Sequence, residues 1–198
     1  MLKWHCFGPS SSLLPIDPEL SSFAGMYFTA IEADPTNCDA LTLLATLCMS
    51  GGHNDPSQLT HAEDLFQRAL AVNGNHAGAL GQYASLIHDR AMSTSKIEDV
   101  DLAEELYMQA VMANPSKVSV LSSFGGFQAN MRRDPIRAEL LYRTALEYDI
   151  THSDTLWQYG NLLRTMKGRD AAAEDMYRCV PTLCPCRNCS CCYSVMFL

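Results

Sequence analysis

The chain has 198 residues, of which 47% are hydrophobic, and its formal net charge is −8. This length suits a single domain or one short solenoid. The negative balance argues against a nucleic-acid partner, because phosphates require clustered Lys and Arg side chains. No apolar run approaches the roughly 20 residues that span a membrane, and the N-terminal residues make a poor signal peptide. A cytoplasmic protein without membrane contact is therefore expected.

The N-terminal segment is rich in proline and serine and should lack regular structure. Asp17 followed by Pro18 is a typical helix start, with a capping side chain and then a proline in the first turn. Helical periodicity continues from there to about residue 180. We therefore divide the chain into an irregular segment (1–18), a helical repeat domain (19–180) and a cysteine-rich tail (181–198) that is expected to be disordered.

The helical domain is predicted to be a series of helices separated by glycine, proline or polar turns. After a first helix that ends near Pro35, the expected helices span residues 37–50, 59–73, 76–91, 99–114, 116–131, 135–149 and 151–166, and a last one ends near Cys179. Residues 53–58 and 92–98 are expected to form longer loops. Each helix is too short to be stable alone in water, so packing between helices must supply the stability.

Every second helix carries the same pattern of small and large side chains. Residues 102–115 read LAEELYMQAVMANP, where Ala103 and Ala110 flank Tyr107 on one stripe of the helix. Small residues let neighbouring helices approach, while the ring fills the space between them. The second small residue of each copy is Ala30, Ala69, Ala110 and Ala145, so successive copies are 39, 41 and 35 residues apart. Periods of this size indicate a repeat array.

The alternate helices carry a second pattern in fixed register. Fifteen residues after each of those alanines comes another small residue, namely Ala45, Ala84, Gly125 and Gly160. A bulky residue precedes each of them, and a leucine lies four positions before. With these two motifs, residues 23–180 resemble tetratricopeptide-repeat (TPR) proteins. The resemblance implies an all-α, right-handed α-solenoid of antiparallel helix pairs, with about three complete repeats and partial repeats at both ends.

In TPR proteins the first helix of each pair lines a concave groove. The resemblance therefore implies a small, polar and nearly uncharged groove for a partner, with one aromatic residue, Trp157, near its C-terminal end. Tryptophan is enriched at binding hot spots, and the alternative, packing of Trp157 against the last helix, has equal weight. Carried over by register, the groove residues are Thr42, Thr46, Gly81, Ser85, His88, Ser122, Gly126, Trp157, Asn161 and Arg164.

These features favour a non-catalytic protein–protein interaction scaffold that docks a peptide or helix of a partner in the groove. Alternatively, the chain is a fragment of a larger protein whose activity lies elsewhere, since the repeat at each end is incomplete. Apolar surface at the C-terminal end of the array also predicts self-association. The residues expected at that contact are Trp157, Tyr159, Leu162, Met176 and Tyr177.

The sequence contains no constellation that is typical of an active site, so neither catalysis nor a cofactor is expected. Five tail cysteines could bind zinc or copper or respond to redox change, although the second ligand pair of a structural zinc site is missing. These are Cys184, Cys186, Cys189, Cys191 and Cys192. A glutamate also recurs at one repeat position, where it is expected to lie in the first helical turn and complement the helix dipole. Its copies are Glu63, Glu104, Glu139 and Glu174.

Overall fold

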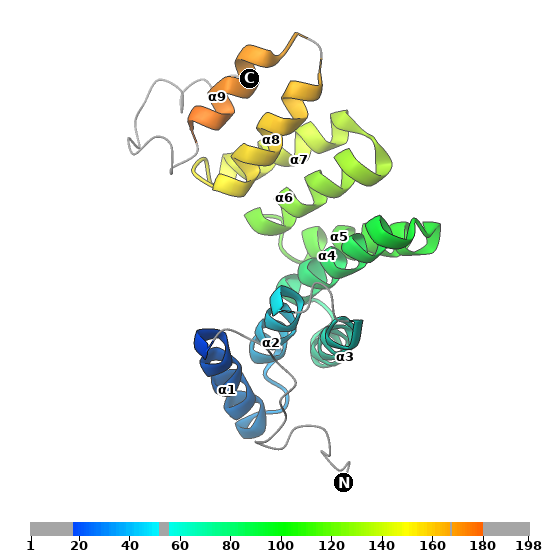
Figure 1. The fold of residues 1–198 in the computed structure, drawn as a ribbon, viewed down its shortest axis with the longest axis vertical. Helices are drawn as coiled ribbons and strands as arrows, with labels where there is room; N and C mark the ends of the chain where they lie inside the picture. The colour runs from blue at the N-terminus through cyan, green and yellow to red at the C-terminus, as the bar shows by residue number, and fades with distance from the viewer. Residues whose placement is uncertain (1–17, 52–55, 167, 180–198) are drawn as a thin grey trace. The chain divides into compact units, whose positions relative to one another are not determined.

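The computed structural model describes residues 18–51, 56–166 and 168–179, which are mostly helical (Figure 1). The chain forms two compact units that divide at Ala79, near the start of α4. The first unit contains α1 (Pro18–Ala33), α2 (Cys38–Gly51) and α3 (Pro56–Val72). The second begins within α4 (Ala77–Thr94), at Leu80, and also contains α5 (Ile97–Ala113), α6 (Val118–Phe127), the π-helix η1 (Gln128–Arg132), α7 (Pro135–Tyr148), α8 (Ser153–Thr165) and α9 (Asp170–Arg178).

In the first unit, α2 packs against both α1 and α3. Leu41, Leu44 and Ala45 of α2 are at most 2% exposed, and Phe66 and Ala69 of α3 are fully buried. The small and large residues that define the repeat pattern are therefore core residues here. Burial of these side chains is the main source of stability for helices of this length.

The described part of the second unit consists of three helix pairs, α4–α5, α6–α7 and α8–α9, and the helices of each pair run antiparallel (Figure 1). Each pair packs on the next, because α5 contacts α6 and α7 contacts α8. Tyr107, Tyr142 and Tyr159 are at most 2% exposed in these interfaces. This is the paired arrangement that the repeat spacing predicts.

The small position of α6 and α8 is glycine because a ring lies against the backbone there. A Cβ atom added to Gly125 would lie 2.6 Å from Cε1 of Tyr142, and one added to Gly160 would lie 2.6 Å from Cε1 of Tyr177. Both rings come from the second helix of the same pair. The glycines thus let the two helices approach until the ring fills the space between them. The predicted register of small and aromatic residues is confirmed.

The turns that connect successive pairs share one hydrogen-bonding pattern. In each, an Asp or Asn side chain accepts the backbone N–H of the residue two positions later, as Asp149 does from Thr151 at 2.9 Å. At this turn, Nδ1 of His152 then accepts the N–H of Thr155 at 3.3 Å and caps α8. These local bonds determine where each first helix begins. The side chains that make the turn are Asp34, Asn73, Asn114 and Asp149.

Residues 92–98 are not the loop that the sequence predicts. α4 continues to Thr94 and α5 begins at Ile97, so the connection is only two residues long. Ser95 reverses the chain in the left-handed conformation, with a φ of 55°. The insertion that lengthens this repeat therefore extends the two helices instead of the turn.

Asp99, in the first turn of α5, accounts for this extension. Arg90 of α4 donates to Oδ1 of Asp99 through Nε at 3.1 Å and through Nη2 at 2.8 Å. The hydroxyl of Thr94 lies 3.3 Å from Oδ2 of the same carboxylate. These contacts tie the end of α4 to the start of α5, and the Arg90 hydrogen bonds lower the pKa of Asp99.

The predictions for the two ends of the chain are only partly covered by the structure. α1 begins at Pro18, as predicted, and α9 ends at Arg178, near the predicted end of the array. Residues 1–17 and 180–198 lie outside the described residues. The irregular N-terminal segment and the cysteine-rich tail therefore stay predictions. Among the helices that are described, none is long and apolar enough to cross a membrane.

Candidate partner-binding surface

The predicted groove residues lie on α2, α4, α6 and α8, and they differ in how much surface they offer a partner. The buried residues are Thr42, Gly81, Ser122 and Gly126. The half-buried residues are Thr46, Ser85, His88 and Asn161. The exposed residues are Trp157 and Arg164. Within this set, exposed side chains therefore occur only on α8.

Two of the buried residues allow the following first helix to approach. A Cβ atom added to Gly81 of α4 would lie 2.6 Å from Cγ2 of Val120 on α6. One added to Gly126 of α6 would lie 2.6 Å from Oε1 of Gln158 on α8. Ser122 is 2% exposed, and its buried hydroxyl finds no hydrogen-bond partner among the described residues. These small side chains, which the sequence assigns to an open groove, serve the packing of consecutive first helices.

The half-buried polar residues of α4 are held by contacts within the second unit. Oγ of Ser85 donates to the carbonyl of Gly81 at 3.1 Å and lies 3.1 Å from the hydroxyl of Tyr107. The ring of His88 meets Phe127 edge to face, with 5.3 Å between centroids. Burial lowers the pKa of His88, so the ring is neutral at neutral pH. Neither side chain presents a charge to a partner.

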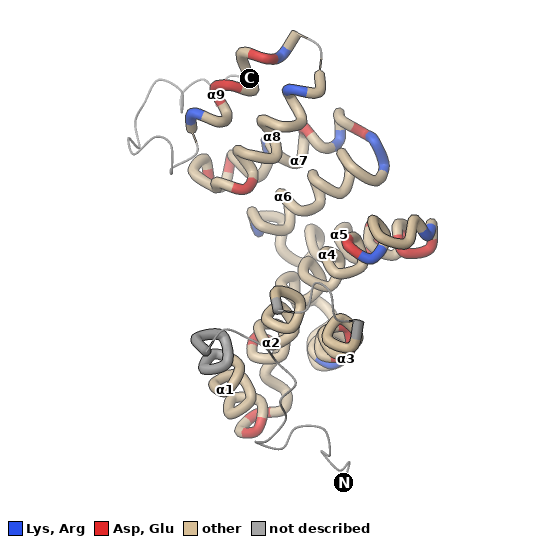
Figure 2. The backbone as a smooth tube through the Cα atoms, in the orientation of Figure 1, with Lys and Arg blue, Asp and Glu red and all other residues tan. Residues whose placement is uncertain are grey.

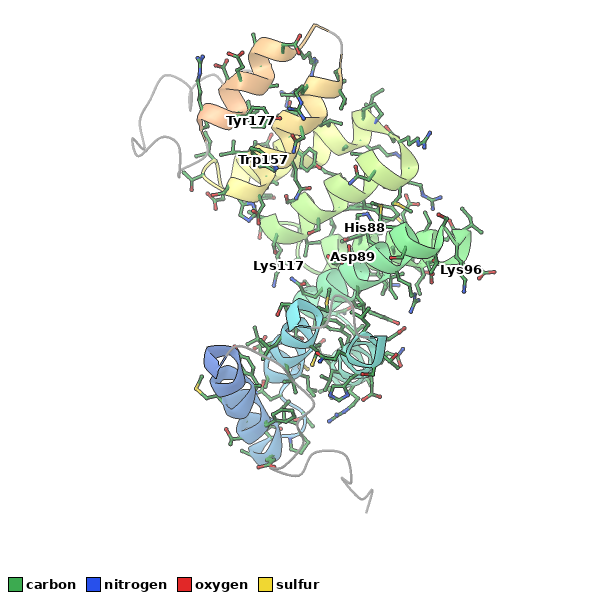
Figure 3. The ribbon with its side chains drawn as sticks, in the orientation of Figure 1. His88, Asp89, Lys96, Lys117, Trp157 and Tyr177 are labelled. Carbon is green, nitrogen blue, oxygen red and sulfur yellow. The ribbon has the colours of Figure 1, made fainter. Side chains whose placement is uncertain are left out.

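On α8, Trp157 keeps 54% of its surface exposed while its ring packs against Tyr177 of α9 (Figure 3). The two ring centroids are 5.1 Å apart and the planes are inclined by 53°. The hydroxyl of Tyr177 donates to Oδ1 of Asn161 at 2.8 Å. Trp157 thus packs against the last helix, as one alternative held, and still offers ring surface to a partner. Sequence reasoning did not assign Tyr177 to the groove, because the repeated aromatic position reads as core.

The recurrent glutamates are not first-turn residues, so that prediction is wrong for Glu63 of α3, Glu104 of α5, Glu139 of α7 and Glu174 of α9. Two of them, Glu104 and Glu139, contact the next pair. Both Glu104 and Glu139 lie beyond the first turn of their helices. Glu104 accepts from Nε2 of Gln128 at 3.0 Å and from Nε of Arg132 at 2.7 Å. Glu139 accepts from the hydroxyl of Tyr159 at 3.0 Å and from Nη1 of Arg169 at 2.6 Å. Figure 2 shows the basic residues at the point where α6 passes through η1 toward α7. These carboxylates join α5 and α7 to the pair that follows each of them.

Three residues predicted at a self-association contact belong to the core of the α8–α9 pair. Tyr159, Leu162 and Met176 are at most 8% exposed. Trp157 and Tyr177 therefore carry the accessible ring surface of that set. The five tail cysteines that the sequence suggests as metal ligands lie outside the described residues. In the described ranges, no group of three or more His, Cys, Asp or Glu side chains is placed to hold a metal ion.

Comparisons with known proteins bear on the fold. No family model matches the chain, and no curated protein matches its sequence. Among solved structures, the TPR protein TTC0263 of Thermus thermophilus matches with a TM-score of 0.71 at 17% identity, over 90% of this chain and 91% of that chain. PilF of Pseudomonas aeruginosa matches with a TM-score of 0.62 at 16% identity, over 85% of this chain and 78% of that chain.

A third match is a TPR protein of Parabacteroides merdae, with a TM-score of 0.56 at 19% identity, over 90% of this chain and 64% of that chain. Identities this low establish the fold alone. They agree with the repeat spacing and with the rings that lie on Gly125 and Gly160. The chain therefore has the fold of tetratricopeptide-repeat proteins.

Proposed function

We propose that this chain is a non-catalytic interaction module that docks a peptide or helix of a partner protein against the first helices of its second unit. The fold supports this proposal, because consecutive first helices present side chains from separate repeats to one ligand. α8 is the centre of the proposed surface, since it carries the exposed members of the predicted set, Trp157 and Arg164.

The observation that carries the proposal is the exposure of Trp157. Its ring is held by Tyr177, yet 54% of its surface remains accessible. A positioned ring loses little conformational freedom when a partner covers it, and tryptophan dominates many binding hot spots. Covering the remaining ring surface would contribute about 2–3 kcal/mol at the usual value per unit of apolar area.

The surroundings of Trp157 favour an apolar anchor on the ligand over an acidic one. Recognition of an acidic chain end requires several convergent Lys, Arg or Asn side chains. Arg164 is exposed on α8, but Asn161 already accepts the hydroxyl of Tyr177. Asp154, one turn before Trp157, is exposed and would repel a carboxylate. The proposed ligand therefore inserts an apolar side chain beside Trp157.

A peptide-display selection tests this proposal, with two alanine variants measured afterwards. Peptides enriched on the wild-type chain are titrated against Trp157→Ala and against Tyr148→Ala. Tyr148 is the matched control, because it lies at the end of α7 and is 55% exposed. We expect Trp157→Ala to weaken binding by about tenfold or more and Tyr148→Ala to change it by less than about threefold. Equal affinity for all three proteins would reject the proposed surface.

A further inference from the structure

The tyrosine rings of α5 and α7 are each covered by an aromatic side chain of the following pair. Tyr107 of α5 stacks on Phe124 of α6, with 5.3 Å between centroids and 18° between planes. Tyr142 of α7 lies 5.9 Å from the ring of Tyr159 on α8. Both tyrosines are at most 2% exposed as a result. In both cases, therefore, the tyrosine ring of a second helix is covered by an aromatic ring from the next first helix.

Tyr177 of α9 holds the equivalent position, but a residue of its own helix pair covers its ring. Its ring lies on Gly160 in the way that the ring of Tyr142 lies on Gly125. The covering ring is Trp157, which comes from the preceding helix α8 (Figure 3). Tyr177 remains half-buried and Trp157 more than half exposed. Among the described residues, these two rings are therefore less completely covered than the tyrosine rings of α5 and α7.

A carboxylate marks the same surface. In α5 and α7 the recurrent glutamate binds the following pair. Glu104 accepts from Gln128 and Arg132 of η1, which continues α6, and Glu139 accepts from Tyr159 of α8 and from Arg169, just before α9. Glu174 is the copy of this glutamate on α9. It contacts Arg178 of its own helix at 3.3 Å, and its side chain is 69% exposed. So exposed a pair contributes little and is easily exchanged for another partner.

We infer that the α8–α9 face, defined by Trp157, Glu174 and Tyr177, receives an amphipathic helix of a partner protein in the manner in which α6 packs on α4–α5. This inference rests on the proposed function and names the chemistry of its partner. The partner helix presents an aromatic side chain to the Trp157–Tyr177 rings. One to two turns later it carries Gln or Arg for Glu174, as α6 and η1 carry Phe124, Gln128 and Arg132.

The probe is a peptide with residues 117–132 of this chain. It contains the aromatic residue and the Gln and Arg residues with which α6 and η1 pack on α4–α5. The chain has two tryptophans, so a Trp4→Phe background makes Trp157 the emitting residue. We expect a saturable change in Trp157 emission on titration with the peptide. The same peptide with Phe124→Ala should bind about tenfold or more weakly, since the stacked ring is lost.

Glu174→Gln in the protein tests the second feature, with Glu147→Gln as control, because Glu147 is an exposed glutamate of α7. We expect Glu174→Gln to weaken binding of the wild-type peptide by about threefold or more and Glu147→Gln to leave its affinity unchanged. The inference is overturned if emission does not saturate up to millimolar peptide, if both peptides bind equally, or if Glu174→Gln has no effect.

Two outcomes separate this inference from its alternatives. In the first, the mass doubles reversibly in sedimentation, Glu174→Gln abolishes the doubling, and the peptide does not bind. This outcome would assign the α8–α9 face to a second copy of the chain and overturn the inference of a partner helix. Selected peptides that depend on Trp157 but not on Glu174 would uphold the proposed function and reject this inference.

Discussion

Gly125→Ala tests whether a ring lies directly on the backbone of α6. The added Cβ would meet Cε1, Cδ1 and Cζ of Tyr142 at 2.6, 2.9 and 3.0 Å. Ordinary contacts of a Cβ atom begin near 3.4 Å. The ring cannot retreat easily, because it is 2% exposed, packs on Tyr159 and donates its hydroxyl to Gln158 at 3.2 Å. Either the pair must separate or the hydrogen bond must break.

The magnitude follows from two opposing effects. Alanine in place of glycine inside a helix gains about 1 kcal/mol from backbone entropy. Overpacking of a close-packed site costs about 1–3 kcal/mol, and loss of the hydroxyl contact adds about 1 kcal/mol. The expected result for Gly125→Ala is therefore a decrease of about 1–3 kcal/mol in the free energy of unfolding.

Two other glycines supply matched controls for this comparison. Gly126 lies beside Gly125, but its added Cβ would meet only Oε1 of Gln158 this closely, and this side-chain end can shift at the cost of its hydrogen bond with Tyr142. Gly25 lies within α1, where an added Cβ meets nothing within 4 Å. In urea unfolding followed by circular dichroism, Gly25→Ala should be the most stable variant, Gly126→Ala the next and Gly125→Ala the least stable. A Gly125→Ala protein as stable as Gly25→Ala would refute the close contact.

Three further perturbations test other contacts. Burial lowers the pKa of His88 below its ordinary 6.5, so the unfolded state binds protons more readily as the pH falls below that value. The free energy of unfolding should decrease from pH 7 to pH 5, and decrease less in His88→Gln, when thermal unfolding is followed across this range. Asp99→Asn removes the charged acceptor of Arg90 and should lower the free energy of unfolding in urea by about 1 kcal/mol; an unchanged value would contradict the account of the α4–α5 connection. Ser95→Gly relieves a φ of 55° and should raise the melting temperature, corresponding to about 0.5–1 kcal/mol, whereas a lower melting temperature would argue against a left-handed turn.

The features that could be predicted from the sequence are the residue patterns that recur in several repeats. The spacing of Ala110 and Gly125, with Tyr107 and Tyr142 beside them, recurs along the chain and corresponds to contacts that the structure shows. Position within a repeat thus determines which residues are buried. The paired helices follow from the same periodicity, because each second helix must cover the apolar stripe of the first.

Features that depend on a contact between particular side chains could not be predicted. Residues 92–98 look like a loop until Asp99 is seen to bind Arg90 across the turn. Ser122 reads as a groove residue, but its helix lies so close to its neighbours that it is 2% exposed. Glu104 reads as a helix-dipole residue. Its actual role, accepting from Arg132, depends on η1, a π-helical segment that the local sequence does not signal.

The proposed function requires that a protein partner covers Trp157. The most direct measurement replaces Trp157 with 5-fluorotryptophan in the Trp4→Phe background and follows its fluorine resonance while a selected peptide is titrated. Trp157 is 54% exposed in the unbound chain, so a ligand that covers it changes the environment of the ring. We expect a resonance that shifts and saturates with the same dissociation constant as binding. A resonance that stays in place while the peptide saturates the protein would contradict the proposed function.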